Sequence, residues 1–372
     1  MNLTVSKEQI INGLQAVQNV VSTRTTLPIL SNVLLHAQEN RLEFTATDLD
    51  VTISCGVEAK VHKPGASTVP VRRLFSIVRE LPNLDIDLEV DEKHACTIRS
   101  GASFYKIHGL SADEFPPLPA FNEEKKVTLS QETVRDMMRK TSFAMSTDES
   151  RYVLNGIYIS LKDHKLTMVA TDGRRLALAD EEVEVVESSQ GEFIVPSKTV
   201  NELNRLLQPK GGVEMHYAEN QASFRLTGEN PGAGDAILVI TKLIEGNYPN
   251  YRQVIPSEMK ERIALAREEF LHALRRAEIM TSEKSNSVKL SFGKNKLEIT
   301  ANSADIGEAK ETLAVNYKGP DLAIAFNPKY MIDPLNALTQ DEVFVELIDE
   351  LSPGVLKING PFLYVVMPMR LS

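Results

Sequence analysis

Three stretches of the chain repeat one pattern of apolar and polar positions. The middle copy, Arg151–Ala179, alternates between the two over Val153–Ser160, which is typical of a strand with one buried face. A polar turn at Lys162–Lys165 separates this strand from a second one, and the corner ATDGRR leads into a third apolar run. The same order occurs at Leu30–Ser54 and at Asn286–Leu313. The pattern therefore predicts a repeated three-strand unit.

The spacing of the repeats predicts the domain organisation. The three polar corners, which follow one another at about 125 residues, are Thr47–Asp48, Thr171–Asp172 and Asn302–Ser303. Proline-rich stretches at 115–126 and 247–260 are candidate linkers. We therefore expect three domains, at residues 1–124, 125–256 and 257–372.

Each repeat also carries two stretches with apolar residues at helical spacing. The six expected helices are Ser6–Val21, Val71–Leu81, Ser130–Met145, Ser197–Leu207, Ala266–Met280 and Pro328–Leu338. Ser6 and Ser130 are expected N-caps, and Asp333 followed by Pro334 is expected to split or shorten the last helix. Two helices on one face of an antiparallel sheet, repeated three times in tandem, make an α+β fold.

Composition narrows the class of protein. The chain has 372 residues, 42% of them hydrophobic and 25% charged, as in ordinary globular proteins. The two cysteines, Cys55 and Cys96, lie in separate apolar segments, so we expect no disulfide framework and a reducing, cytoplasmic location. The N-terminus does not have the pattern of a signal peptide, and no apolar run is long enough to span a membrane.

The sequence offers no constellation for catalysis. The histidines are scattered, the cysteines form no C-x-x-C pair, and no phosphate-binding glycine motif joins a strand to a helix. Asp48 and Asp172 hold equivalent places and could suggest acid–base chemistry. Asx-type hydrogen bonds at a strand-end corner explain them better. We expect no enzyme, no cofactor and no metal ion.

Positive charge gathers on the predicted helices, although the formal net charge of the chain is −10. The helices hold 13 basic and 9 acidic residues, which leaves −14 on the rest of the chain. One basic face would suit a phosphate backbone without reading bases; ordinary solvated helix faces are the alternative. The candidate DNA contacts on helices are Arg72, Arg73, Arg79, Arg135, Arg139, Lys140, Lys198, Arg205, Arg275 and Arg276.

Six motifs occur in a fixed order over the full length of the chain. They are RTTLPILSN (Arg24–Asn32), FTATDLD (Phe44–Asp50), RYVLNGI (Arg151–Ile157), VATDGRRLA (Val169–Ala177), YPNYRQVIP (Tyr248–Pro256) and YVVMPMRL (Tyr364–Leu371). In these motifs the chain resembles the family of bacterial DNA polymerase III beta subunits, the sliding clamps. The three-fold repeat agrees with this resemblance.

The resemblance implies a DNA-clamp architecture that closes into a ring as a head-to-tail homodimer. Helices would line the hole and sheets would form the outer wall. The ring would encircle duplex DNA regardless of sequence. It would tether the replicative polymerase alpha subunit, the clamp loader, other polymerases and repair proteins through short linear motifs. A repeat scaffold that binds such motifs without encircling DNA is the alternative.

The resemblance also implies a peptide-binding pocket between the second and third domains. Its residues would be Arg151, Leu154, Thr171, Gly173, Arg174, Arg175, Leu176, Pro249, Val254, Asn327, Tyr330, Val365, Val366, Met367, Pro368, Met369 and Arg370. The chain departs from the family pattern at Arg174, Gln253 and Asp148. The last departure weakens a DNA contact on the 148–150 loop and leaves the loop around Arg24 as the better candidate.

A dimer interface is expected between the first domain of one chain and the third domain of the other. An apolar stripe on the second helix, beside Arg73, and an acidic strand in the third domain suggest the two surfaces. The predicted interface residues are Arg73, Ile77, Leu81, Tyr105, Ile279, Met280, Asp305, Glu308 and Glu311.

Overall fold

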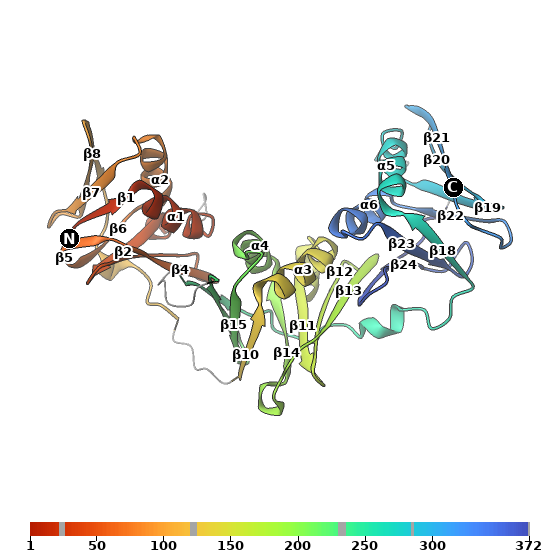
Figure 1. The fold of residues 1–372 in the computed structure, drawn as a ribbon, viewed down its shortest axis with the longest axis horizontal. Helices are drawn as coiled ribbons and strands as arrows, with labels where there is room; N and C mark the ends of the chain where they lie inside the picture. The colour runs from red at the N-terminus through yellow and green to blue at the C-terminus, as the bar shows by residue number, and fades with distance from the viewer. Residues whose placement is uncertain (22–26, 120–124, 230–235, 284–285, 371–372) are drawn as a thin grey trace. The chain divides into compact units, whose positions relative to one another are not determined.

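A computed structural model describes residues 1–21, 27–119, 125–229, 236–283 and 286–370 of the chain (Figure 1). The helices within these residues are α1 (Lys7–Val17), α2 (Val71–Glu80), α3 (Gln131–Thr141), α4 (Ser197–Leu206), α5 (Arg267–Glu278) and α6 (Pro328–Ala337). Helices α1 and α2 pack against each other, as do α5 and α6 (Figure 1). All six predicted helices are present. None of the helices in the described residues is long and apolar enough to cross a membrane.

The helix starts follow the predicted caps except at α6. Ser6 accepts a hydrogen bond from the backbone N–H of Gln9, at 3.2 Å, and Ser130 accepts one from Thr133, at 3.0 Å. These two caps are confirmed.

The prediction that Pro334 splits or shortens α6 is wrong. The helix runs through this proline and is capped by Asn327, whose Oδ1 accepts from the N–H of Lys329 at 3.0 Å. Proline lacks the N–H that would bond the carbonyl of Tyr330 one turn earlier. The hydroxyl of Tyr364 donates to that carbonyl instead, at 2.6 Å, so the helix tolerates the proline.

The described strands form four antiparallel sheets. The first contains, in spatial order, β5 (Lys60–Lys63), β1 (Asn2–Ser6), β7 (Asp85–Val90), β8 (Ala95–Ser100) and β9 (Ser103–His108). The second contains β10 (Lys125–Ser130), β15 (Gly212–Tyr217), β16 (Gln221–Thr227), β17 (Ile237–Lys242), β4 (Val51–Glu58), β3 (Arg41–Thr47), β2 (Asn32–Gln38) and β6 (Gly65–Pro70).

The other two sheets are built from the second half of the chain. The larger contains β14 (Gly191–Pro196), β11 (Gly156–Lys162), β12 (Lys165–Thr171), β13 (Arg175–Glu182), β25 (Phe362–Val366), β24 (Gly354–Lys357), β23 (Glu342–Leu347) and β18 (Glu261–Ala266). The smaller contains β21 (Gly307–Ala314), β20 (Lys296–Ser303), β19 (Val288–Gly293) and β22 (Leu322–Phe326). The α+β fold with antiparallel sheets is confirmed.

Both eight-stranded sheets join strands of two successive repeats. In the first, β4 pairs with β17, so that Val51 lies opposite Thr241. In the second, β13 pairs with β25, so that Arg175 lies opposite Val366. Each sheet is thus continuous across a predicted domain boundary.

Contacts divide the described chain into two compact units. One contains residues 1–135, 187–189 and 198–243, and the other contains residues 136–186, 190–197 and 244–372. The second predicted domain contributes to both units, so the boundaries at residues 124 and 256 stay a prediction.

The strand predicted to start near Val153 begins later. Residues Glu149–Leu154 form a 3-10 helix, and β11 starts at Gly156. Asp148 caps this short helix, because its carboxylate accepts from the N–H of Ser150 at 3.0 Å. The hydrogen bond accepted by the Asp148 carboxylate favours a helical turn at these residues, so the strand starts later than the alternating pattern predicts.

Candidate functional site

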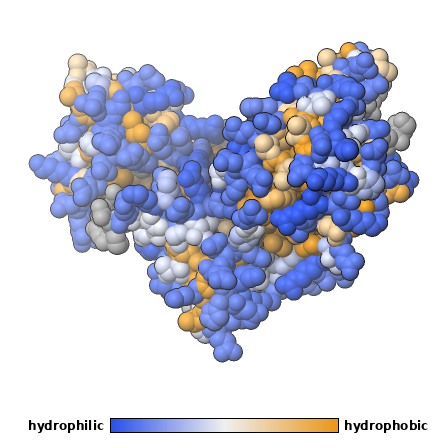
Figure 2. Space-filling model, turned by 45° about the vertical axis from the view of Figure 1, so that its right-hand side comes forward, coloured by the Kyte–Doolittle hydropathy of each residue, from blue (hydrophilic) through white to orange (hydrophobic). Residues whose placement is uncertain are grey.

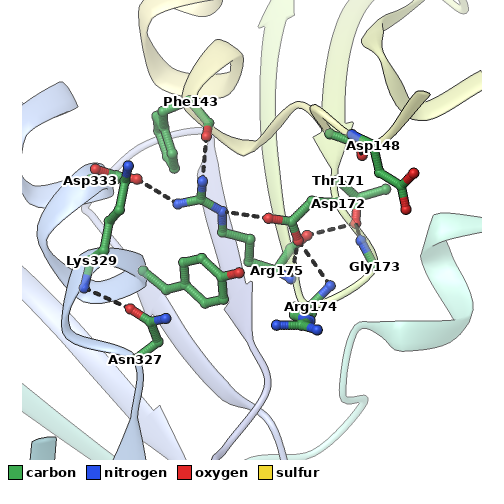
Figure 3. Close-up of polar contacts among 12 residues, drawn as sticks. Phe143, Asp148, Thr171, Asp172, Gly173, Arg174, Arg175, Asn327, Lys329 and Asp333 are labelled. Carbon is green, nitrogen blue, oxygen red and sulfur yellow. Dashed lines mark hydrogen bonds and ion pairs between the residues drawn. The ribbon is translucent and has the colours of Figure 1, made fainter. Parts of the chain in front are cut away.

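The polar corner between β12 and β13 is fixed by its own side chains (Figure 3). Thr171 Oγ1 accepts from Gly173 N at 3.1 Å and donates to Arg175 O at 2.6 Å. Asp172 Oδ1 accepts from the N–H groups of Arg174 and Arg175, at 2.9 and 3.1 Å. Gly173 has φ of 84°, a conformation that favours glycine. The Asx interpretation of this corner is confirmed, and Asp172 serves structure.

Arg175 lies beneath this corner, where it is 8% exposed (Figure 3). Its guanidinium donates to Asp172 Oδ2 at 3.0 Å, to Asp333 Oδ2 at 2.6 Å and to the carbonyl of Phe143 at 2.7 Å. The ring of Tyr330 lies 4.4 Å from the guanidinium carbon, within cation–π range. The side chain therefore joins the corner to α6 and to the 3-10 helix Ser142–Ala144.

The charges around Arg175 reinforce its ionised state. Burial pulls the pKa of Arg175 down, but the hydrogen bond to Asp333 and the nearby charges outweigh burial and raise that pKa above its ordinary value. Burial also raises the pKa of the neighbouring Tyr364 hydroxyl. Arg175 was predicted as a residue of the peptide-binding pocket, but its guanidinium is enclosed and bonded on three sides.

Arg151 lies on the exposed side of the same corner. Its Nη1 donates to the carbonyl of Asp172 at 3.3 Å, and its Nε lies 3.7 Å from Asp148 Oδ2. A Cβ atom built on Gly173 would approach Arg151 Nη1 to 2.7 Å. The glycine thus leaves room for the arginine, and Asp148 orients it.

The C-terminal strand supplies the other side of the site. Met367 N donates to Arg174 O at 2.9 Å, and Met369 N donates to Ala325 O at 2.7 Å, so the segment continues along the corner after β25 ends. Met367 is 45% exposed and Met369 is 37% exposed. Apolar surface gathers on the part of the molecule shown at the right of Figure 2.

Several predicted pocket residues lie below the surface. The buried apolar ones are Leu154, Leu176, Val365 and Val366. Leu176 and Val365 belong to a core cluster with Val169 and Val355, against which Tyr248 packs. Both were predicted as pocket residues, and the structure encloses their side chains in this core cluster. They support the surface from beneath.

The remaining predicted pocket residues surround the corner region at different depths. Val254 and Pro249 are exposed on the segment after Tyr248, whose ring stacks on Tyr158 with centroids 5.0 Å apart. Asn327 caps α6 and Tyr330 covers Arg175. All 17 predicted pocket residues lie in one compact unit. The network beneath them, with Phe143 and Asp333, was missed, because nothing in the sequence links such distant positions.

Ten of the predicted DNA contacts lie on helices, and Arg24 lies outside the described residues. Within the described chain, the exposed side chains of Arg72, Arg73 and Arg135 have no acidic partner in an ion pair. The others are engaged by nearby groups. The pairs are Arg79–Glu80, Arg139–Asp136, Lys140–Asp136, Lys198–Asp48, Arg205–Glu202, Arg275–Asn336 and Arg276–Glu311.

Two of the paired cations have a structural role. Arg205 donates to the carbonyls of Gln15 and Ala16 at the end of α1, both at 2.8 Å. Lys198 donates to the carbonyl of Val20 at 3.4 Å as well as to Asp48. Helix α1 has no basic residue in its last turn, so these contacts stabilise its C-terminal end from α4.

The predicted dimer surfaces are partly available. Ile279 is 70% exposed, and Tyr105 is exposed on the edge strand β9. Leu81 is only 4% exposed, because the apolar stripe of α2 packs into its own core, so the prediction is wrong at this residue. Glu311 already pairs with Arg276. Sequence reasoning missed Phe104, which is 60% exposed on β9.

The described residues do not contain a group of three or more His, Cys, Asp or Glu side chains placed to hold a metal ion. Cys55 and Cys96 are buried thiols, and the Cys55 thiol donates to the carbonyl of Gly13 at 3.4 Å. Burial raises the pKa of the Cys96 thiol to about 12, so this side chain stays protonated at neutral pH.

Comparison with known proteins covers the whole chain. Family models described as the N-terminal, central and C-terminal domains of the DNA polymerase III beta subunit match residues 1–119, 128–250 and 252–370. The beta sliding clamp of Chlamydia muridarum is 36% identical over 371 residues, covering 100% of this chain and 99% of that protein. The clamp of Salmonella typhimurium is 37% identical over 379 residues, covering 100% of both. The solved DnaN sliding clamp of Bartonella birtlesii, bound to griselimycin, is 34% identical, with a TM-score of 0.93 and full coverage of both chains.

The Arg175 network predicts a large stability effect from one residue. Arg175→Ala should lower the free energy of unfolding by about 3–5 kcal/mol, because two partly buried carboxylates would be left without their cation. Arg174→Ala, at the exposed neighbouring position, should change it by less than about 0.5 kcal/mol. Urea unfolding followed by circular dichroism measures both, and similar losses of stability in the two variants would contradict the role of the network.

Proposed function

This chain belongs to the family of DNA polymerase III beta subunits, the sliding clamps, and we propose how its own residues carry out that role. It is a processivity factor and not an enzyme. The proposal is that two copies close head to tail around duplex DNA and hold partner proteins by short linear motifs. The match of three successive family domains over nearly the whole chain carries this proposal, since a scaffold that never encircles DNA has no need of that architecture.

We propose that the ring closes between α2 with β9 of one copy and the end of α5 with β21 of the other. Tyr105 and Phe104 are exposed on the edge strand β9, and Ile279 is exposed just after α5. Strand β21 is the edge of its own sheet, so the N–H and C=O groups on its outer side are open to pairing with another chain. Glu308 is part of this strand and Asp305 lies just before it, and Arg73 of α2 is a cation without an ion-pair partner among the described residues.

The dimer and its ring can be tested together. Ile279→Ala/Met280→Ala should raise the dimer dissociation constant at least about tenfold, since exposed apolar anchors carry much of an interface. Retention on nicked circular DNA, with release after linearisation, should fall in parallel. Sedimentation velocity measures the dimer, and Leu351→Ala, which removes an equally exposed side chain (71%), is the control. A double variant that stays fully dimeric at low micromolar concentration would contradict this interface.

We propose that only some of the basic residues on the helices contact DNA. Arg72, Arg73 and Arg135 are exposed and have no ion-pair partner among the described residues. They can therefore bind phosphate without first breaking an ion pair with a carboxylate. Lys198 and Arg205 would have to leave Asp48 and Glu202 first. Contacts to phosphate alone carry no sequence information.

Salt dependence tests this division. Arg72→Gln/Arg135→Gln should lower the slope of log affinity against log salt for a short linear duplex by roughly 0.9 for each phosphate that is no longer neutralised. Arg139→Gln/Lys140→Gln should leave the slope nearly unchanged, because both side chains pair with Asp136. Fluorescence anisotropy over a salt series measures the slopes. If the second variant lowers the slope as much as the first, ion pairing does not select the residues that bind DNA.

We propose that one surface binds the replicative polymerase alpha subunit, the clamp loader, other polymerases and repair proteins. The surface consists of the Thr171–Arg175 corner, Arg151, the N-terminal end of α6, and the segment Met367–Arg370. Exposed methionines adapt to different apolar side chains, which suits several partners. Three exposed arginines, at 151, 174 and 370, supply a polar edge.

Removing the C-terminal segment tests the surface. Deletion of Met367–Ser372 should weaken binding of a short apolar peptide copied from a polymerase C-terminus by more than about 30-fold, since few anchors carry such binding. The milder Met367→Ala/Met369→Ala should show most of the same effect, and Val186→Ala, at another exposed position of the same unit, should show none. Calorimetry measures the affinity, and sedimentation shows that the dimer persists. If the truncated ring binds the peptide as tightly as the intact one, the partner surface lies elsewhere.

A further inference from the structure

The corner between β3 and β4 repeats the hydrogen bonds of the corner between β12 and β13. Thr47 Oγ1 accepts from Leu49 N at 3.1 Å and donates to Val51 O at 3.1 Å. Asp48 Oδ1 accepts from Asp50 N and Val51 N, at 3.1 and 2.8 Å. The two corners, 47–51 and 171–175, are therefore equivalent in backbone and in the side chains that fix them.

The strand that follows each corner is also equivalent. Lys242 N donates to Asp50 O at 3.0 Å at the end of β17, as Met367 N donates to Arg174 O just after β25. Each corner and its strand form a junction between repeats. The first junction consists of residues 47–51 and 241–243, and the second of residues 171–175 and 366–368.

The third residue of the corner differs in a way that bears on ligands. Gly173 in the second junction has φ of 84°, and Leu49 in the first has φ of 80°. A leucine in this conformation is strained, and Leu49 is also 47% exposed. The flexible guanidinium end of Arg151 lies beside Gly173, where a ligand can displace it, whereas the first corner carries an exposed leucine side chain at the same position.

The next pair of residues closes the first junction further. Lys242 Nζ donates to Asp50 Oδ1 at 2.9 Å, so an ion pair bridges the corner and the strand. The equivalent residues of the second junction, Met367 and Arg174, cannot form such a bridge, because a thioether carries no charge. Met367 offers an exposed apolar side chain where the first junction has an ammonium group.

We propose that these three positions decide which junction accepts a partner peptide. Gly173, Arg174 and Met367 make the second junction receptive to an extended apolar peptide. Leu49, Asp50 and Lys242 close the equivalent first junction to the same ligand. This inference rests on the partner surface proposed above and explains why two junctions of one backbone design would provide one site per chain.

The test uses the intact dimeric ring and calorimetry with the same polymerase-derived peptide. The wild-type ring should bind one peptide per chain. Gly173→Leu should weaken binding by more than about 30-fold, because a leucine would cover the corner backbone. The structure already accommodates leucine at this conformation in the first corner, and the new side chain would displace the flexible end of Arg151, so the variant should fold. Leu49→Gly, the matched change at the first corner, should leave the affinity of the wild-type site unchanged.

A second variant tests the same inference in case Gly173→Leu does not fold. Arg174→Asp/Met367→Lys rebuilds the ion pair of the first junction and should weaken binding to a similar degree, with the thermal unfolding midpoint preserved. Two peptides bound per wild-type chain, or Gly173→Leu binding as tightly as wild type, would overturn the inference. If the wild-type ring binds no peptide, the proposed partner surface fails instead. If Gly173→Leu binds but the 367–372 truncation does not, the surface is right and the deciding positions are wrong.

Discussion

Antiparallel pairing between strands of successive repeats is the interaction on which the described structure depends. The β4–β17 and β13–β25 ladders are built from directional backbone hydrogen bonds, and a slip of one residue would turn every side chain to the opposite face. With the register fixed, the residue at each strand end meets the carbonyl of the neighbouring corner. The ladders therefore bring each corner beside its neighbouring strand end, and the side chains of the corner then fix the turn.

The two corners share one backbone conformation but differ in the cation that pairs with their aspartate. Asp48 receives a lysine from α4, and Asp172 receives an arginine from its own corner that continues to Asp333 of α6. A guanidinium can satisfy two carboxylates and a carbonyl at once because its donors are spread over a rigid plane. The second junction consequently has its ionic link underneath, and its outer surface is left to apolar and flexible side chains.

Local patterns in the sequence were enough to predict the helices, the repeat and the caps at Ser6 and Ser130, because each depends on neighbouring residues. Predictions failed where a distant partner decided the outcome. Pro334 sits inside α6 since Tyr364 supplies the missing donor, and Leu81 faces its own core instead of a second chain. The predicted site residues gathered in one unit, but the burial of Leu176 and the enclosure of Arg175 depend on contacts that no local spacing encodes.

The pairing of most helix cations with carboxylates has a consequence for motion. An isolated arginine gives a phosphate a deep local energy minimum, whereas a cation already held by a carboxylate gives a shallow one. A duplex inside the proposed ring would be attracted strongly by a few unpaired cations, such as Arg72 and Arg135. Elsewhere along the helices the electrostatic potential would vary little. The barrier between neighbouring positions along the helix axis would then be small, so the ring could diffuse along DNA with little friction while remaining topologically bound.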